Sequence, residues 1–527
     1  MFARALIFLV MLGLVTSALT AQRPPAESQA GRNSDFVPEE ATISDIHAAL
    51  RAGRITCVQV VQAYLRRIEA YDDRGPALNA IITVNRRALE TAADLDQVHA
   101  ASPSDLRPLH CIPVILKDNY DTADMPTTGG SLTLAASVPL RDGCVVRKLR
   151  DAGAIILAKA NLTELARGGT TVSSLGGQTR NPYDLTRTPG GSSGGTGAAI
   201  AASFAITGTG SDTGQSVRSP ASAQNLVGLR PTRGLISRSG IIPVSITQDE
   251  AGPITRTVAD AARMLDIMAG YDPDDPITAL GAHRIPPTYT AFLNPDALKG
   301  ARIGVLMEFF GRDPVHQDVN AVTEDAIKKM AEAGATTIRI TIPALDHLTR
   351  NVQVAEYEGK IAFNRYLAAL GPRAPVKTFD EFIARGEFHS SLKASLETDR
   401  RVVDGLNDAE YKNRLLRRDD LCKAVMNVIA ANKLDAILYP HQRRLVVPIG
   451  EDQVERNGVL SNSTGFPAIT FPGGFSRPTG SAPLGVPVGI ELLGPEWSEP
   501  ALIAFAFAFE QAAKPRRPPA STPPLTR

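Results

Sequence analysis

The stretch from residue 168 to residue 240 constrains this 527-residue chain most, because glycine, serine and threonine crowd together in it. A flexible linker has a similar composition. Here, however, the glycine-rich loop at 189–195 is followed at once by a small-residue helix at 197–205 and then by a second glycine-rich loop. We therefore expect the stretch to belong to a folded body.

Strand and helix patterns alternate along the rest of the chain. Short apolar runs typical of buried strands occur at 113–116 (PVIL), 154–158 (AIILA) and 301–306 (ARIGVL). Apolar residues three and four apart, typical of helices, occur at 42–72, 142–152 and 319–333. Thr56 has the residue type and position of a helix N-cap. The alternation predicts an α/β fold with both faces of the sheet covered by helices.

The N-terminus has the pattern of a secretory signal peptide. Arg4 precedes an unbroken apolar run at 5–15, and small residues follow at 16–21. A run of about eleven residues is too short for a bilayer, which needs about 20. We expect cleavage after Ala21 or Ala18, a secreted or periplasmic location and no stable membrane insertion afterwards. An uncleaved anchor or a buried helix is the alternative.

The predicted order is a signal peptide (1–21), a flexible lead-in (22–38), one large domain (39–515) and a disordered Pro-rich tail (516–527). Lys plus Arg number 56 and Asp plus Glu 55, so the net charge is +1. That balance gives no electrostatic reason to expect a nucleic acid or an anionic membrane as partner.

Four cysteines are far apart in the sequence and none forms a CxxC pair: Cys57, Cys111, Cys144 and Cys422. Metal-site and redox motifs are therefore absent from the sequence. One disulfide is compatible with an oxidising compartment, but spacing does not select the pair. Buried free thiols are the default expectation.

Two other kinds of site contain loops of a composition similar to that of 189–195 (PGGSSGG). A phosphate-binding loop needs Lys followed by Ser or Thr after its glycines, and neither pair is present. The loop also matches G-x-S-x-G, the nucleophile elbow of α/β-hydrolases, with Ser193 at its centre. An elbow follows a buried strand, which 184–191 does not resemble, so this interpretation is disfavoured. His347 and His441 would be its candidate bases.

Several segments taken together closely resemble the amidase signature family. They are 113–131 (PVILKDNYDTADMPTTGGS), 176–199 (GGQTRNPYDLTRTPGGSSGGTGAA), 208–234 (GTGSDTGQSVRSPASAQNLVGLRPTRG), 252–262 (GPITRTVADAA), 462–475 (NSTGFPAITFPGGF) and 487–497 (PVGIELLGPEW). The resemblance covers about residues 40–515. It implies a mixed sheet with helices on both faces, and hydrolysis of a carboxylic amide to an acid plus amine or ammonia, without metal or cofactor.

By this resemblance the nucleophile falls on Ser216, the bridging serine on Ser192 and the base on Lys117. The Gly191–Ser192 peptide bond is then expected to be cis. The backbone N–H groups of Thr213, Gly214, Gln215 and Ser216 would form the oxyanion hole. Gln215 departs from the family, which usually has glycine there, and this puts the substrate scope in question.

Further roles follow from the same resemblance. Ala166 aligns with the position whose backbone carbonyl faces the substrate, so that Ala166, Ser192 and Gln215 are the expected substrate-binding residues. Asp212 and Arg218 are expected to support the nucleophile, and Ser193 to hold the loop through a hydrogen bond. By general surface preference, and not by the resemblance, His441 is expected to be a solvated loop histidine, with a place in the acyl pocket as the alternative. The mostly helical residues 355–431 are expected to shape the acyl pocket.

Lysine activates a serine only when it is neutral, which requires burial or a cationic neighbour. Lys117 ends an apolar run, so burial of its stem is expected; the alternative is an ion pair with Asp118 or Asp121. The predicted enzyme belongs to the general amidases among hydrolases of linear amides. The open alternatives are a catalytically silent binding homologue and a glutamine-hydrolysing amidotransferase A-type subunit. The particular small-molecule amide and the oligomeric state stay open.

Overall fold

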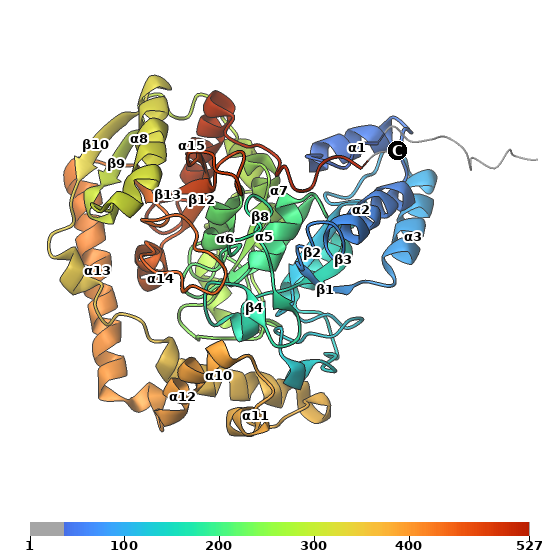
Figure 1. The fold of residues 1–527 in the computed structure, drawn as a ribbon, viewed down its shortest axis with the longest axis horizontal. Coiled ribbons are helices and arrows are strands. Elements are labelled where there is room, and N and C mark those ends of the chain that lie inside the picture. Colours follow the sequence, from blue (N-terminus) through green and yellow to red (C-terminus); the bar gives the residue numbers. More distant parts are fainter. Residues whose placement is uncertain (1–35, 526–527) are drawn as a thin grey trace, which may run out of the picture. The chain divides into compact units, whose positions relative to one another are not determined.

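One mixed sheet organises the computed structural model, which describes residues 36–525. In the described part of the chain this sheet has eleven strands, in the order β1-β3-β2-β6-β8-β7-β12-β13-β11-β9-β10 (Figure 1). The strands are β1 (Ile81–Val84), β2 (Pro113–Lys117), β3 (Ile155–Ala160), β6 (Thr207–Asp212), β7 (Val227–Arg230), β8 (Glu250–Thr255), β9 (Arg302–Leu306), β10 (Thr336–Ile340), β11 (Ala436–Pro440), β12 (Ala468–Phe475) and β13 (Pro487–Leu493). A separate pair consists of β4 (Val172–Ser173) and β5 (Gly177–Gln178).

Parallel pairing occurs near both ends of the sheet, where β2 pairs with β3 and β6, and β9 pairs with β10 and β11. The central strands β8, β7, β12 and β13 pair antiparallel. The predicted α/β fold with a mixed sheet is therefore confirmed.

The helices are α1 (Ile43–Arg51), α2 (Cys57–Tyr71), α3 (Ala88–Ala101), α4 (Cys144–Asp151), α5 (Gly194–Ala201), α6 (Arg218–Ala223), α7 (Val258–Met268), α8 (Gln317–Glu332), α9 (Leu345–Leu348), α10 (Ala355–Leu370), α11 (Phe379–Arg385), α12 (Lys393–Arg401), α13 (Ala409–Asn432), α14 (Val459–Thr464) and α15 (Glu499–Ala513). Thr56 caps α2 as predicted, because its hydroxyl accepts from the N–H of Gln59 at 3.2 Å. No helix among residues 36–525 is long and apolar enough to cross a membrane.

Helices cover both faces of the sheet because successive residues of a strand point to opposite sides. In β12, Phe471 packs against Phe509 of α15, with ring centroids 5.5 Å apart. The next residue back, Thr470, donates to Glu491 of β13, which also receives a hydrogen bond from Arg218 of α6. Thus α15 lies on one face and α6 on the other, as the resemblance implies.

The glycine-rich stretch belongs to the folded body, as expected, and much of it lies in the core. Every residue of α5 (GGTGAAIA) and of β6 (TGTGSD) is buried. A Cβ on Gly208 would lie 2.5 Å from Cγ2 of Thr196, and one on Gly195 would meet the backbone of Asn161. The small residues are needed because helix and strand backbones approach more closely here than larger side chains allow.

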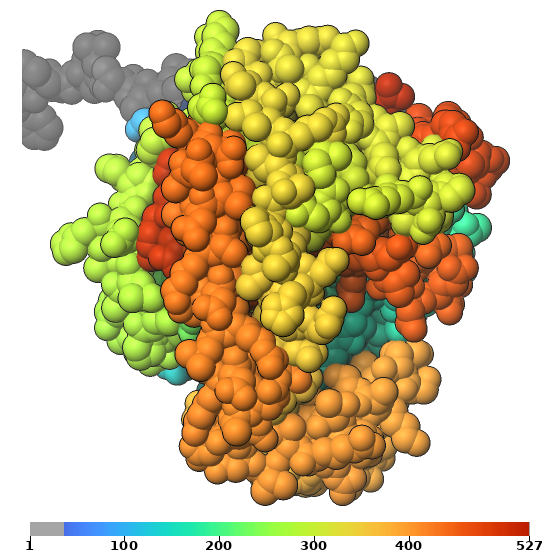
Figure 2. Space-filling model, turned by 90° about the vertical axis from the view of Figure 1, so that its left-hand side faces the viewer, coloured from blue at the N-terminus to red at the C-terminus, as the bar shows by residue number. Residues whose placement is uncertain are grey.

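A group of helices, α10 to α12, lies together at the lower edge of the view, and α13 connects it to the far end of the sheet (Figure 1). In the space-filling view, α13 runs down the surface beside this group (Figure 2). Phe363, Phe379, Phe382 and Leu396 form a hydrophobic cluster with three residues from the N-terminal half of the chain, Leu134, Leu165 and Ile242. The group thus has its own small core, which those three residues join to the body.

Two expectations from the sequence differ from the structure. Cys57 and Cys111 form a disulfide instead of being free, because α2 begins beside the loop before β2; Cys144 and Cys422 are free. Residues 516–525, expected as a disordered tail, contact the body: Arg516 pairs with Glu40 at 2.8 Å, and the carbonyl of Thr522 accepts from Arg67 at 2.9 Å. The predicted signal peptide and most of the lead-in lie outside the described residues.

Candidate active site

Lys117 is the last residue of β2 and its side chain is completely buried. Its ammonium Nζ donates to Oγ of Ser192 at 2.7 Å and to Oγ of Ser211 at 2.8 Å. It also donates to the carbonyl of Ser211 at 3.2 Å. The sheet creates this arrangement because β2 pairs with β6, which ends at Ser211 and Asp212.

Burial lowers the pKa of Lys117 to about 7, while the negative charges of Asp212 and Asp249 oppose this shift. Lysine at that pKa is substantially neutral near neutral pH and can accept a proton. The alternative ion pair with Asp118 or Asp121 is not formed. Asp118 pairs with Lys159 at 3.1 Å, and Asp121 accepts from the Tyr366 hydroxyl at 2.8 Å.

Ser192 lies two residues before α5 and is completely buried. The Gly191–Ser192 peptide bond is cis, as the resemblance implies. The Ser192 carbonyl accepts from the N–H of Thr163 at 2.9 Å, which anchors the loop. Ser193 donates its backbone N–H to the carbonyl of Ser216 at 3.3 Å and its hydroxyl to the carbonyl of Ser211 at 3.4 Å. The two glycine-rich loops are thereby joined.

Ser216 lies between β6 and α6 and is 6% exposed. The hydroxyls of Ser216 and Ser192, both in the described part of the chain, are not hydrogen-bonded to each other. The backbone N–H groups of residues 213–216 have no acceptor there either, and all four residues line a cavity. Buried N–H groups are nearly always paired, so four neighbouring N–H groups without an acceptor indicate a place where a ligand accepts. Such donors suit an oxygen atom on which negative charge develops.

Asp212 and Arg218 hold this loop in shape. Asp212 accepts from the N–H of Val217 and from Nε of Arg218, each at 3.1 Å. Arg218 also donates to the carbonyl of Gly214 at 2.8 Å. Although burial opposes ionisation, Arg218 and Arg230 hold the pKa of Asp212 well below its usual range. The nucleophile loop is thus fixed at both ends by one buried ion pair.

His441 is completely buried and is not the solvated loop residue that the sequence suggested. Its Nδ1 lies 2.6 Å from Glu491, which also accepts from Arg218 at 2.6 Å and from Tyr439 at 2.8 Å. Burial raises the pKa of Glu491, but Arg218 and His441 outweigh it and lower that pKa to about 2. Sequence reasoning missed Glu491, although it lies inside the 487–497 motif.

A cavity of about 670 Å³ opens over the nucleophile. It is lined by residues of the nucleophile loop, of α10, of α12 and of the segment before α14, among them Ala166, Gln215, Ser216, Glu356, Asp399 and Arg456. Ala166 and Gln215 therefore lie where the substrate is expected, whereas Ser192 lies behind the cavity wall. Arg456 was missed in the sequence because no motif surrounds it.

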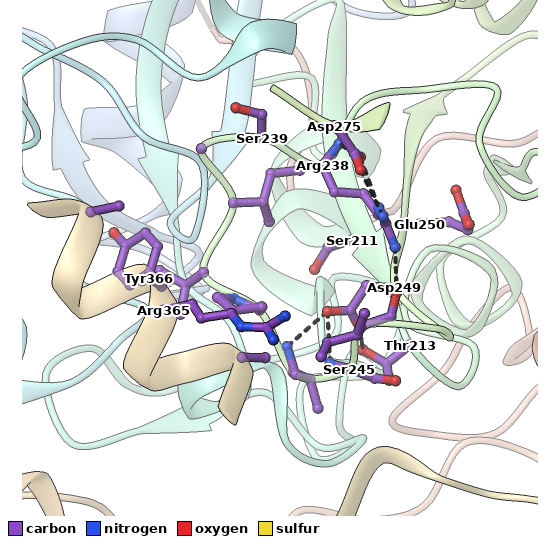
Figure 3. A pocket seen from close by; sticks show the side chains of 18 of the residues that line it. Ser211, Thr213, Arg238, Ser239, Ser245, Asp249, Glu250, Asp275, Arg365 and Tyr366 are labelled. Carbon is purple, nitrogen blue, oxygen red and sulfur yellow. Dashed lines mark hydrogen bonds and ion pairs between the residues drawn. The ribbon is translucent and has the colours of Figure 1, made fainter. Parts of the chain in front are cut away.

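A second cavity, of about 340 Å³, shares Thr213 and Val244 with the first (Figure 3). Asp249 points into it and accepts from the N–H groups of Val244 and Ser245 at 2.8 and 2.9 Å. Ser211, the hydrogen-bond partner of Lys117, lines it as well. Lys117 does not line this second cavity itself, but it contacts Ser211, which does.

Comparison with known proteins decides the family. The amidase family model matches residues 59–503. The chain belongs to the amidase family. The reaction of this amidase is hydrolysis of an amide bond. A probable amidase of Arabidopsis thaliana is 36% identical, with 96% of each chain covered.

Two further relatives are informative. The crystal structure of native peptide amidase from Stenotrophomonas maltophilia matches with a TM-score of 0.82 and 36% identity, over 91% of this chain and 98% of that one. The A-type subunit of the glutamyl-tRNA(Gln) amidotransferase of Thermoanaerobacter pseudethanolicus is 35% identical over 90% of this chain and 96% of its own length.

Proposed function

We propose that this amidase hydrolyses linear carboxylic amides through an acyl-enzyme on Ser216, with Ser192 as proton bridge and Lys117 as base. The observation that carries the proposal is the buried Lys117, whose Nζ lies 2.7 Å from Oγ of Ser192 without any carboxylate partner in the described chain. A serine needs such a base to attack an amide.

The proton moves from Oγ of Ser216 to Oγ of Ser192, whose own proton passes to Nζ of Lys117. Oγ of Ser216 forms a bond to the carbonyl carbon, and the N–H groups of residues 213–216 stabilise the oxyanion. Protons then return through Ser192 to the leaving nitrogen as the C–N bond breaks. Water hydrolyses the ester, releasing the acid. The Ser192–Ser216 contact is expected to tighten when substrate binds, as catalytic hydrogen bonds commonly do.

The Cys57–Cys111 disulfide supports a location outside the cytoplasm, because disulfides persist in oxidising compartments. The N-terminal sequence pattern supports the same location. We accordingly propose a secreted or periplasmic general amidase. An amidotransferase component is the second candidate, favoured by the 35% identical relative of that name. It would work in the cytoplasm on glutamine beside a partner protein.

A fluorophosphonate probe tests the nucleophile directly. Wild-type protein should be labelled and should release ammonia or amine from a panel of small amides, and Ser216→Ala should lose both properties. Ser193→Ala is the matched control from the neighbouring loop and should keep both. Equal labelling of Ser216→Ala would overturn the assignment, and absence of labelling would favour the silent homologue. Hydrolysis of glutamine alone would favour the amidotransferase.

A further inference from the structure

The charged side chains that line the active-site cavity are two arginines and two carboxylates, and only one of the four has no ion-pair partner. Arg167 pairs with Asp399 at 2.6 Å, and Glu356 pairs with Arg414 at 3.2 Å. Arg456 has no carboxylate within 4.0 Å among residues 36–525, and its side chain is exposed. Arg456 is therefore the cavity-lining charge that has no ion-pair partner in the described chain and that a ligand can reach.

Arg456 lies between the two loops that line the nucleophile's side of the cavity. Its Nη1 lies so close to Gly169 that a side chain at that position would collide with it. On the other side, the amide oxygen of Gln215, oriented toward the guanidinium, accepts from Nε at 2.7 Å and from Nη1 at 3.0 Å. This orientation is the correct one, because the opposite one would set the amide N–H₂ group against N–H donors.

The contact with Gln215 uses two of the five N–H donors of the guanidinium. No other acceptor for the Arg456 side chain lies in the described chain, so both N–H groups of Nη2 and one of Nη1 are free. A fixed guanidinium with a free edge suits a carboxylate, which it binds through two parallel hydrogen bonds. Gln215, the residue that departs from the family, thus positions the arginine beside the nucleophile.

We propose that Arg456 binds a carboxylate carried by the substrate, so that the preferred substrates are anionic amides. In a primary amide the leaving group is ammonia, which leaves only the acyl part to carry the anion. Among primary amides, the class proposed here is therefore the monoamides of short dicarboxylic acids. This inference rests on the proposed function of Ser216 and specifies the substrate class of the same site.

The test compares amides matched in chain length with and without the terminal carboxylate. The probes are succinamate, glutaramate and adipamate against butyramide, pentanamide and hexanamide. Charge-assisted hydrogen bonds of this kind correspond to about 10- to 100-fold in affinity. Wild type should therefore favour at least one anionic amide by about tenfold or more in kcat/KM, chiefly through a lower KM. Added salt should reduce that ratio because the arginine is exposed.

Arg456→Met should bring the ratio of anionic to neutral kcat/KM to about one or below. Arg456→Lys, which keeps the charge but not the planar fork, should give an intermediate ratio. Arg444→Met is the matched control, since Arg444 lies in the same segment, 4.0 Å from Glu455, and does not line the cavity. Thermal unfolding of each variant shows whether it is folded. If Arg456→Met does not fold, the ratio of anionic to neutral kcat/KM in Arg456→Lys provides the test.

Protection from fluorophosphonate provides a readout that needs no turnover. Succinate or glutarate should slow labelling of Ser216 in wild type and Arg444→Met, but not in Arg456→Met. Labelling and hydrolysis with an unchanged ratio in Arg456→Met would overturn only this inference and would leave Arg456 a structural support of Gln215. Absence of both labelling and hydrolysis in wild type would overturn the proposed function and this inference with it.

Discussion

Two completely buried lysines lie on neighbouring strands of the sheet and have different partners. Lys117 ends β2, and Lys159 lies beside it in β3, where it faces Leu116 in the strand register. Lys159 pairs with Asp118 at 3.1 Å, whereas Lys117 contacts only the hydroxyls of Ser192 and Ser211 and one carbonyl.

The difference shows what distinguishes a base from a structural cation. A buried ammonium with a carboxylate partner stays charged, whereas one surrounded by neutral hydroxyls loses its proton more easily. Lys117 and Asp118 are consecutive residues, and their side chains point to opposite sides of the sheet, as successive residues of a strand do. Asp118, the immediate neighbour of Lys117, is therefore turned toward Lys159.

Replacing the base should have the largest effect. In Lys117→Met the side-chain volume is nearly kept, but the proton acceptor is lost, so kcat/KM for a small amide should fall by about 10³-fold or more. Steady-state kinetics and circular dichroism check activity and folding together. Activity within tenfold of wild type would mean that Lys117 is not the base.

The pH profile of the wild type should reveal the lowered pKa of Lys117. Only the neutral amine accepts a proton, so kcat/KM should fall about tenfold per pH unit below the pKa of about 7 and level off above it. Measurement between pH 5 and 9 with a neutral amide checks this. A profile that keeps its full value at pH 5 would contradict a lysine base.

Ser211→Asp would give Lys117 the kind of partner that Lys159 already has. The new carboxylate, at the position of an oxygen 2.8 Å from Nζ, should raise the pKa of Lys117 by at least about one unit. Activity at pH 7 should then fall about tenfold or more and recover partly at higher pH. Ser211→Asn, similar in shape but neutral, is the control, and an identical pH profile in both variants would refute the explanation.

Lys159→Met should change activity least and stability most. It leaves Asp118 buried without its cation, a change that costs about 3–5 kcal/mol in comparable cases. Denaturant unfolding should show this loss, while kcat/KM per folded molecule stays within about threefold of wild type. The double variant Lys159→Met/Asp118→Asn should regain part of the stability, since no unpaired charge then remains. Loss of catalysis at unchanged stability would reverse the roles of the two lysines.

Local pattern and motif resemblance predicted much of this protein. Thr56 caps its helix, 113–116 and most of 154–158 lie in strands, and the small-residue segment forms a helix of the folded body, as expected. The small-residue helix begins and ends a few residues earlier than expected, because α5 starts directly after the loop that holds Ser192. The family resemblance also singled out Lys117 and Ser192, which the structure places in contact.

The remaining features come from residues far apart in the chain. Arg218 and Glu491 are separated by 273 positions, and their pairing depends on α6 packing against the face of the sheet that Glu491 of β13 occupies. His441 and the Cys57–Cys111 pair could not be assigned for the same reason. Neither periodicity nor composition encodes the order of strands in a sheet, so neither predicts which side chains it brings together.

Gln215 and Arg456 illustrate the difference between what the sequence predicts and what the tertiary structure decides. The sequence by itself determined the α/β class, the small-residue helix, the family resemblance and the position where this chain departs from its relatives. Only the tertiary structure decided what that departure does, because Gln215 contacts Arg456 across 241 positions. A side chain's neighbours follow from the packing of whole elements, and the selectivity of this site depends on those neighbours.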